Sequence, residues 1–169
     1  LLAVFLFQAS ADAGDTLRRI MAREEVRCGV SDGILGFSIK QADGRWAGMD
    51  VDFCRALSAA VLGDPEKVSY VPLTAAARFA SLKAGEIDVL VRNTTWTLER
   101  EAGMEVMFAG ILYFDGQSFL VPAASQVHEL SQLQGAVICA VKGSTHEKNL
   151  SDHFSFRKWN YQPLIVDSQ

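Results

Sequence analysis

The stretch that decides the fold is the apolar run Ile87-Asp88-Val89-Leu90-Val91, which leads directly into Arg92-Asn93-Thr94-Thr95-Trp96-Thr97-Leu98-Glu99-Arg100. The apolar run predicts a buried strand. The polar residues therefore begin at the carboxyl end of a strand, which is where ligands bind in open α/β sheets. The threonine hydroxyls and the Asn93 amide can donate and accept hydrogen bonds, and the planar guanidinium of Arg100 suits a carboxylate.

This polar segment predicts a binding site for a small anionic or zwitterionic molecule, because no nucleophile stands beside a base. A second interpretation stays open on these residues alone. Asn93, Thr94 and Thr95 would then form a solvated loop, and Arg100 would pair with Glu99 or Glu101 on a surface turn.

The composition is that of an ordinary globular protein. The 169 residues are 49% hydrophobic and 21% charged, and this length allows one domain, or one and a part. The net charge of −4 gives no electrostatic reason to expect a nucleic-acid partner. No apolar run of about 20 residues predicts a transmembrane helix.

The first 13 residues predict part of a secretory signal peptide. Residues 1–7 are apolar and residues 9–13 are small, as in an h-region followed by an A-x-A cleavage site. An initiating methionine and a basic n-region do not precede them, so we expect the chain to start partway through the signal. The alternative interpretation is a buried strand of the fold.

The three cysteines are Cys28, Cys54 and Cys139. In an oxidising compartment an odd count indicates a free thiol, a partner in another chain, or a partner outside this sequence. No CxxC motif or Cys/His cluster is present, so we expect no metal site and no cofactor.

The elements alternate in the order βαβαβ. Strands are expected at 26–30, 68–72 and 87–91, and the helices between them begin at Asp50, a predicted N-cap, and at Thr74. This order predicts a parallel sheet with right-handed crossovers. A further extended run is expected at 117–121.

A second βα unit is expected after residue 122. It has a buried strand at 136–141 and a helix that begins at the turn Gly143-Ser144-Thr145. Such a turn presents backbone N–H groups to an anion, or it only caps its helix.

Short motifs along the chain resemble the periplasmic solute-binding proteins of polar-amino-acid ABC transporters, in particular the general L-amino-acid-binding branch. They occur in the family's order and spacing across nearly all of the chain after residue 25. The motifs are 26–30, 36–38, 48–56, 71–74, Arg78-Phe79, Leu82, 85–90, 92–98 with Arg100, 113–117, and 143–145 with Glu147 and Asn149-Leu150.

The resemblance implies a two-lobed periplasmic-binding-protein fold of the α/β class, with the ligand held between lobes joined by hinge strands. Residues 14–120 would form a nearly complete lobe one. Residues 121–169 would form the hinge and the start of a truncated lobe two, and the first hinge crossing would lie near 118–124. The family's acidic residue for the ligand ammonium, and the return crossing, would lie beyond Gln169. We therefore expect this chain alone to bind weakly or not at all.

The resemblance also implies roles for site residues. Arg100 would hold the ligand α-carboxylate in a two-pronged pair. Thr95 would hold both carboxylate and ammonium, with Thr94 beside it, and the Asn93 backbone carbonyl would face the ammonium. The turn at Ser144 and Thr145 would donate to the carboxylate from the other lobe.

Many relatives carry an aromatic residue near Ile34, where this chain is aliphatic. We therefore expect Phe37 or Trp96 to supply the apolar wall of the site, although Phe37 has a second interpretation as a core residue. Close relatives share the pair that matches Cys28 and Cys54, which implies a disulfide. Cys139 would then pair with a cysteine outside this sequence.

The function implied is the substrate-binding component of an amino-acid ABC transporter. It would be periplasmic, non-enzymatic and monomeric when complete, and it would deliver an L-amino acid to a membrane permease. One alternative is the sensor domain of a receptor. Another is a dehydratase-like enzyme, which would need a general acid such as His146, the one histidine near the predicted rim. The sequence does not set the preferred amino acid.

Overall fold

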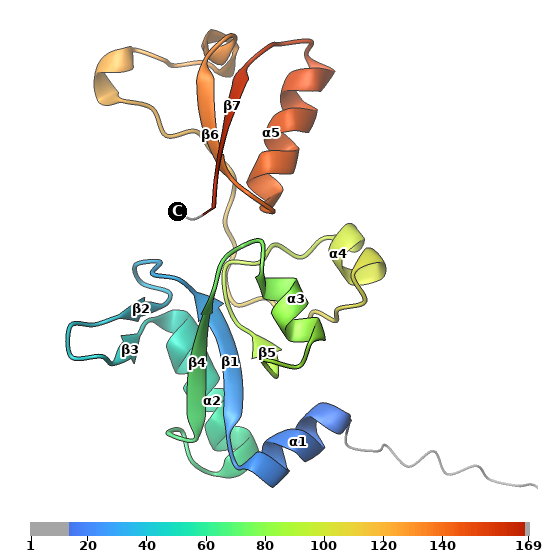
Figure 1. The fold of residues 1–169 in the computed structure, drawn as a ribbon. Coiled ribbons are helices and arrows are strands. Elements are labelled where there is room, and N and C mark those ends of the chain that lie inside the picture. Colours follow the sequence, from blue (N-terminus) through green and yellow to red (C-terminus); the bar gives the residue numbers. More distant parts are fainter. Residues whose placement is uncertain (1–13, 168–169) are drawn as a thin grey trace, which may run out of the picture.

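A computed structural model describes residues 14–167, which form two α/β parts joined by an extended segment (Figure 1). The signal-peptide prediction falls on residues 1–13, outside the described range, and stays a prediction. The elements of the first part are α1 (Asp15–Arg23), β1 (Val26–Ser31), β2 (Ile39–Lys40), β3 (Trp46–Ala47), α2 (Met49–Leu62), β4 (Val68–Leu73), α3 (Arg78–Lys83), β5 (Val89–Leu90) and α4 (Leu98–Gly103). Those of the second part are η1 (Ala123–Ser125), η2 (Leu130–Leu133), β6 (Val137–Val141), α5 (Thr145–Phe156) and β7 (Gln162–Val166).

The first sheet has the order β4-β1-β5, and all three strands are parallel. The register pairs Val26 with Val68 at one end of β1, and Gly29 with both Val71 and Leu90. After β1 the chain forms β4 on one side of it and then β5 on the other side, so the direction of strand addition reverses at β1. Ligands bind at such a switch point, beyond the carboxyl ends of the strands. The predicted α/β class and the βαβαβ order are confirmed.

Both faces of β1 are covered, which explains its small and apolar residues. On one face Cys28 and Val30 pack with Cys54 of α2 and with Val91. On the other face, a side-chain carbon at Gly29 would come within 2.5 Å of Ile87 and 3.1 Å of Leu73, so only glycine fits without a shift.

A disulfide joins Cys28 in β1 to Cys54 in α2, as the resemblance implied. Their Cα atoms lie 6.2 Å apart and both residues are fully buried. The bond ties the helix to the central strand. Cys139 is a free, exposed thiol within the described residues.

The start of α2 corrects the prediction that Asp50 is its N-cap. The N-cap is Gly48, with a φ of 123°, and Asp50 is a buried residue of the first turn. A side-chain carbon at Gly48 would lie 2.3 Å from the Phe37 carbonyl oxygen, so the backbone approaches too closely for any larger residue. The N–H groups of Met49 and Asp50 bond to the carbonyls of Gly36 and Phe37, so backbone contacts hold the helix start.

The second part is smaller. Strands β6 and β7 are parallel, and α5 packs on them through a cluster of Leu133, Ala140, Leu150 and Phe154. Phe119 and Val121, from the extended segment, pack against the same cluster.

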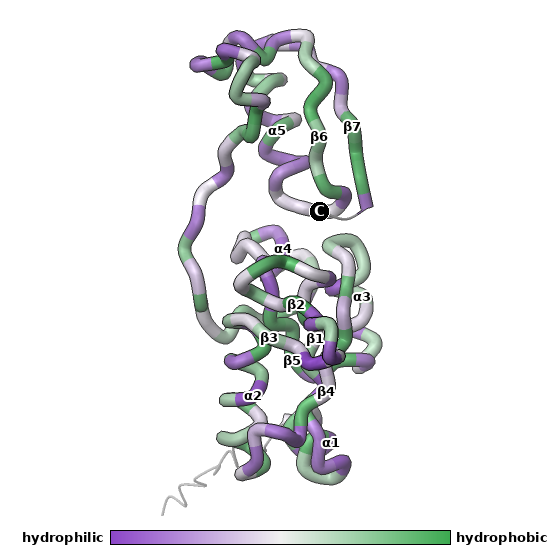
Figure 2. The backbone as a smooth tube through the Cα atoms, turned by 90° about the vertical axis from the view of Figure 1, so that its left-hand side faces the viewer, coloured by the Kyte–Doolittle hydropathy of each residue, from purple (hydrophilic) through white to green (hydrophobic). Residues whose placement is uncertain are grey.

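The extended segment, residues 106–122, contains neither helix nor strand, so the run at 117–121 is extended but unpaired. Figure 2 shows it passing along one side of the molecule between the two parts. Gln117 attaches it to α5: its amide nitrogen donates to the His146 carbonyl at 3.2 Å, and its amide oxygen accepts from the Asn149 side chain at 2.9 Å.

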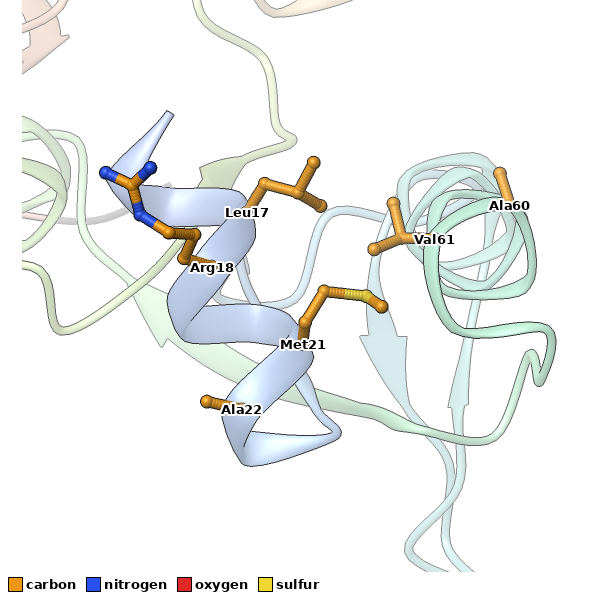
Figure 3. A pocket seen from close by; sticks show the side chains of 6 residues that line it. All are labelled: Leu17, Arg18, Met21, Ala22, Ala60 and Val61. Atoms are coloured by element: carbon orange, nitrogen blue, oxygen red, sulfur yellow. The ribbon is translucent and has the colours of Figure 1, made fainter. Parts of the chain in front are cut away.

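The described helices include none that is long and apolar enough to cross a membrane. A broad apolar hollow of about 830 Å³ lies between α1 and the end of α2 (Figure 3). It is at the end of the first part that faces away from the second part (Figure 1). The side chains that line it are Leu17, Arg18, Met21, Ala22, Ala60 and Val61.

Candidate ligand-binding site

The predicted polar segment follows β5 directly and leads into α4, at the carboxyl edge of the first sheet. Thr97 is the N-cap of α4, and its hydroxyl accepts a hydrogen bond from the Arg100 backbone N–H at 3.2 Å. This local cap turns the chain so that Arg100 lies inside the helix's first turn and is buried.

Arg100 is 6% exposed, which rules out the surface-turn interpretation. Its guanidinium donates to the Thr95 carbonyl at 2.7 Å and forms no salt bridge with Glu99 or with any other described residue. Glu101 instead accepts from the indole N–H of Trp96 at 2.7 Å. Burial lowers the pKa of Arg100, and the charge of Glu99 opposes this shift. A buried guanidinium with most of its N–H groups uncommitted is suited to bind a carboxylate.

Thr95 and Thr145 bring the two parts of the chain together. Their hydroxyl oxygens are 3.0 Å apart, although 50 residues separate them in the sequence. Thr145 is the first residue of α5 and Thr95 follows β5. The polar segment that follows β5 and the turn that begins α5, both predicted as binding segments from the sequence, therefore meet.

The remaining groups of the α5 turn are largely engaged within the turn. The Ser144 hydroxyl donates to the Val141 carbonyl at 2.6 Å and accepts from the Glu147 N–H at 3.2 Å. The Gly143 N–H donates to the Glu147 carboxylate at 2.8 Å. Ser144 is thus an N-cap in this structure, and Thr145 is the residue that faces the other part.

Arg92 holds the Asn93 side chain in place. Its guanidinium donates to the Asn93 amide oxygen at 3.1 and 2.8 Å and to the Leu73 carbonyl at the end of β4. Asn93 is exposed, so its amide N–H groups and its backbone carbonyl remain available to a ligand. Beside it, the Thr94 hydroxyl is buried and has no hydrogen-bond partner among the described residues.

Asp50 lies close to Arg92 and was not expected at this site. Its carboxylate is buried, and one oxygen has no hydrogen-bond partner among the described residues. Burial raises the pKa of Asp50 to about 6, and the charge of Arg92 opposes this shift. Burial lowers the pKa of Arg92, and the charges of Asp50 and Asp32 oppose that shift.

Phe37 and Trp96, the expected apolar wall, contact aromatic residues of the extended segment. Phe37 meets Tyr113 edge to face at 5.3 Å between ring centroids. Trp96 is 44% exposed and stacks on Phe108 at 5.3 Å with an interplanar angle of 9°. The extended segment therefore supplies two aromatic rings that the sequence did not assign to the site.

Arg78 is a second buried residue near these groups that the sequence did not assign to the site. It begins α3, is 2% exposed, and donates to the carbonyls of Ala75 at 2.7 Å and of Gly143 at 3.4 Å. The helical spacing of Ala75, Arg78 and Ser81 could have indicated it, because Ala75 and Ser81 are small residues of a buried face.

A second hollow, of about 180 Å³, lies between the extended segment and η2. Neither this hollow nor the one beside α1 is lined by a predicted ligand residue. Within residues 14–167, no three metal-ligating side chains gather to form a metal site.

The chain has two α/β parts joined by an extended segment. They meet through polar residues that follow a strand in one part and begin a helix in the other. This arrangement is typical of two-lobed ligand-binding proteins. The chain belongs to the bacterial extracellular solute-binding proteins, family 3, whose pattern matches residues 26–162. This confirms the resemblance noted in the sequence.

Individual relatives agree with this assignment. The chain is 45% identical to the general L-amino acid-binding periplasmic protein AapJ of Rhizobium johnstonii, over 98% of this chain and 49% of AapJ. It is 44% identical to the glutamate/glutamine/aspartate/asparagine-binding protein BztA of Rhodobacter capsulatus, over 94% of this chain and 47% of BztA.

Among solved structures, an ABC transporter periplasmic binding protein from Brucella ovis, with glutathione bound, superposes with a TM-score of 0.86. It is 43% identical, over 92% of this chain and 49% of that protein. The chain thus spans about half the length of these relatives, which are named as binding proteins and not as enzymes.

Proposed function

We propose that this chain is the ligand-binding part of a non-enzymatic, periplasmic component of an amino-acid ABC transporter. It binds an L-amino acid between its two lobes through the ligand α-carboxylate and α-ammonium, and it delivers the ligand to a membrane permease. Residues 14–120 belong to lobe one in this proposal, and residues 121–169 to the hinge and lobe two. The complete protein acts as a monomer.

The observation that carries the proposal is the arrangement of Arg100, Thr95 and Thr145. A buried, unpaired guanidinium donates to the backbone of Thr95, whose hydroxyl in turn meets Thr145 of the other lobe. A carboxylate on Arg100 would accept two parallel hydrogen bonds and would neutralise a charge whose burial is unfavourable. Closure of the lobes around that carboxylate follows the hinge motion of two-lobed binding proteins.

The relatives support an amino-acid ligand. AapJ is named for general L-amino acids and BztA for four of them, and the Brucella protein has bound glutathione. We assign to the α-carboxylate the groups of Arg100, Thr95, Ser144 and Thr145. The backbone carbonyl of Asn93, with Thr94 beside it, faces the ammonium, and Phe37 and Trp96 wall the ligand side chain.

The test is calorimetric titration of a panel of L-amino acids into the protein as encoded from its start codon to its stop codon. We expect saturable binding of several amino acids with no turnover. Arg100→Ala should lower affinity at least about 100-fold for every ligand, since it removes the partner of a buried carboxylate.

Arg45→Ala is the matched control, because Arg45 is an exposed arginine that pairs with Asp43 away from the site. It should bind like the wild type. Unchanged affinity in Arg100→Ala would refute the assigned site, and the absence of binding across the panel in a folded protein would refute the function.

A further inference from the structure

The Arg92 side chain joins two strand ends beside the proposed ammonium site. Its Nε atom and one terminal nitrogen donate to the Asn93 amide oxygen at 3.1 and 2.8 Å, and its other terminal nitrogen donates to the Leu73 carbonyl at the end of β4. Because a guanidinium is planar and rigid, these bonds fix the Asn93 side chain relative to β4. The segment after β5 is thereby attached to the strand on the other side of β1.

The backbone at Asn93 forms a tight three-residue turn. The Thr94 N–H donates to the Arg92 carbonyl at 2.6 Å, so Asn93 is the central residue of the turn. A turn of this kind is closed by a single hydrogen bond, which by itself contributes little to holding a conformation. The Thr94 hydroxyl is buried and adds no hydrogen bond within residues 14–167. The bonds from the Arg92 side chain are therefore the ones that can hold this turn in place.

Two carboxylates favour the charged form of Arg92. Burial lowers the pKa of Arg92, and the charges of Asp50 and Asp32 oppose this shift. Among the described residues, Arg92 forms no salt bridge with either of them, and its hydrogen bonds go to amide and peptide oxygens. Hydrogen bonds from a charged donor are stronger than those from a neutral one, so the bonds to Asn93 and Leu73 are well suited to fix a turn.

We propose that Arg92 is a positioning residue of the ligand site, which fixes the Asn93 turn so that the Asn93 backbone carbonyl faces the ligand ammonium. This inference rests on the proposed function, which assigns that carbonyl to the ammonium. Arg92 acts through the Asn93 side chain and does not itself contact the ligand. Its effect on affinity is therefore the same for every amino acid, whatever the ligand side chain.

The experiment is a double-substitution cycle. Three neutral L-amino acids with different side chains, glutamine, alanine and leucine, are titrated calorimetrically into the protein as encoded. Arg92→Met and Asn93→Ala both remove the side-chain bonds but keep the backbone carbonyl, so each should lower the affinity for every ligand about tenfold. The double variant should also lose about tenfold, because both substitutions remove the same bonds, whereas independent effects would multiply to about 100-fold.

Further variants separate positioning from charge and from folding. Arg92→Lys keeps the charge but reaches only one of the two acceptors, so it should bind as weakly as Arg92→Met. Arg45→Met removes an exposed arginine that likewise bonds to a nearby side chain, Asp43, and should bind like the wild type. Asn93→Ala changes an exposed side chain and should unfold at the wild-type temperature, so it decides the question if Arg92→Met does not fold.

Wild-type affinity in Asn93→Ala, or a multiplied loss in the double variant, would show that Arg92 does not act through Asn93 and would overturn the inference. Full affinity in Arg92→Lys would also overturn it, because only the charge would then matter. So would a loss confined to one ligand, which would show direct contact with the ligand side chain. In these cases the wild type still binds amino acids and the proposed function stands. No binding of any amino acid by the wild type would overturn both.

Discussion

The buried carboxyl group of Asp50 should make folding stability depend on pH, and a substitution at this single residue tests it. Its pKa is raised from 3.8 to about 6 by burial. The folded protein therefore holds a proton on Asp50 at a pH where the unfolded chain has released it. Because of this, folding stability falls as the pH rises from about 4 to about 6, and the full loss persists above pH 6. A shift of about two units corresponds to about 3 kcal/mol at neutral pH.

Asp50→Asn should remove that loss. We expect its free energy of unfolding, measured with urea, to exceed that of wild type by up to about 3 kcal/mol at pH 7.5. The difference should shrink as the pH falls toward 4. Asp52→Asn removes an exposed carboxylate from the same helical turn and is the matched control. A difference that does not vary with pH would show that Asp50 is not the titrating group.

At the residue scale, the sequence predicted site residues through strand position but not their surroundings. Arg100 was predicted as a site residue because a polar stretch follows an apolar run. Asp50 was predicted to be the N-cap of this helix, since Asp is frequent at helix starts, but the close approach of the Phe37 carbonyl allows only glycine at the N-cap, which is Gly48. The helical spacing of Arg78 with Ala75 and Ser81 indicates a buried face, but its hydrogen bond to the Gly143 carbonyl, 65 residues away, is encoded by no local pattern.

At the scale of elements, the disulfide between β1 and α2 should be a main source of stability in lobe one. It closes a loop with a sequence separation of 26 residues and joins two fully buried residues. A loop of this length corresponds to about 3 to 4 kcal/mol through the entropy of the unfolded chain.

Replacing both residues, Cys28→Ala with Cys54→Ala, should lower the free energy of unfolding by about this amount, as measured by urea denaturation. Cys139→Ala, which removes an exposed thiol, should leave it within about 0.5 kcal/mol of wild type. Equal stability of the double variant and wild type would show that lobe one does not depend on the bond.

The strands of the first sheet were predicted correctly because each is a short apolar run between turn residues and helices. The run at 117–121 looks the same locally, yet it forms no strand. Phe119 and Val121 bury their side chains against the α5 cluster, and Gln117 bonds to α5. Pairing depends on a neighbouring strand, and alternation of apolar and polar residues cannot show whether one is present.

At the scale of the whole molecule, the relation of the two lobes depends on few polar contacts. Thr95 meets Thr145 at 3.0 Å, and Arg78 meets Gly143 at 3.4 Å. Hydrogen bonds of this kind contribute about 1 kcal/mol each, which is too little to fix two lobes against thermal motion. We therefore expect the lobes to separate and approach in solution, with a bound ligand favouring approach.

A reversible cross-link tests this expectation. In a Cys139→Ser background, Thr95→Cys with Thr145→Cys should form a disulfide under mild oxidation, because the side-chain oxygens of these residues are already in contact. The matched control pairs Thr95→Cys with Ser151→Cys, about 9 Å further along α5 by helical rise. The first pair should cross-link well ahead of the second, because the Thr95 and Thr145 side chains are the ones in contact. Equal cross-linking of both pairs would mean that the lobes do not meet in one defined arrangement, and the assignment of Thr145 to the ligand site would fail with it.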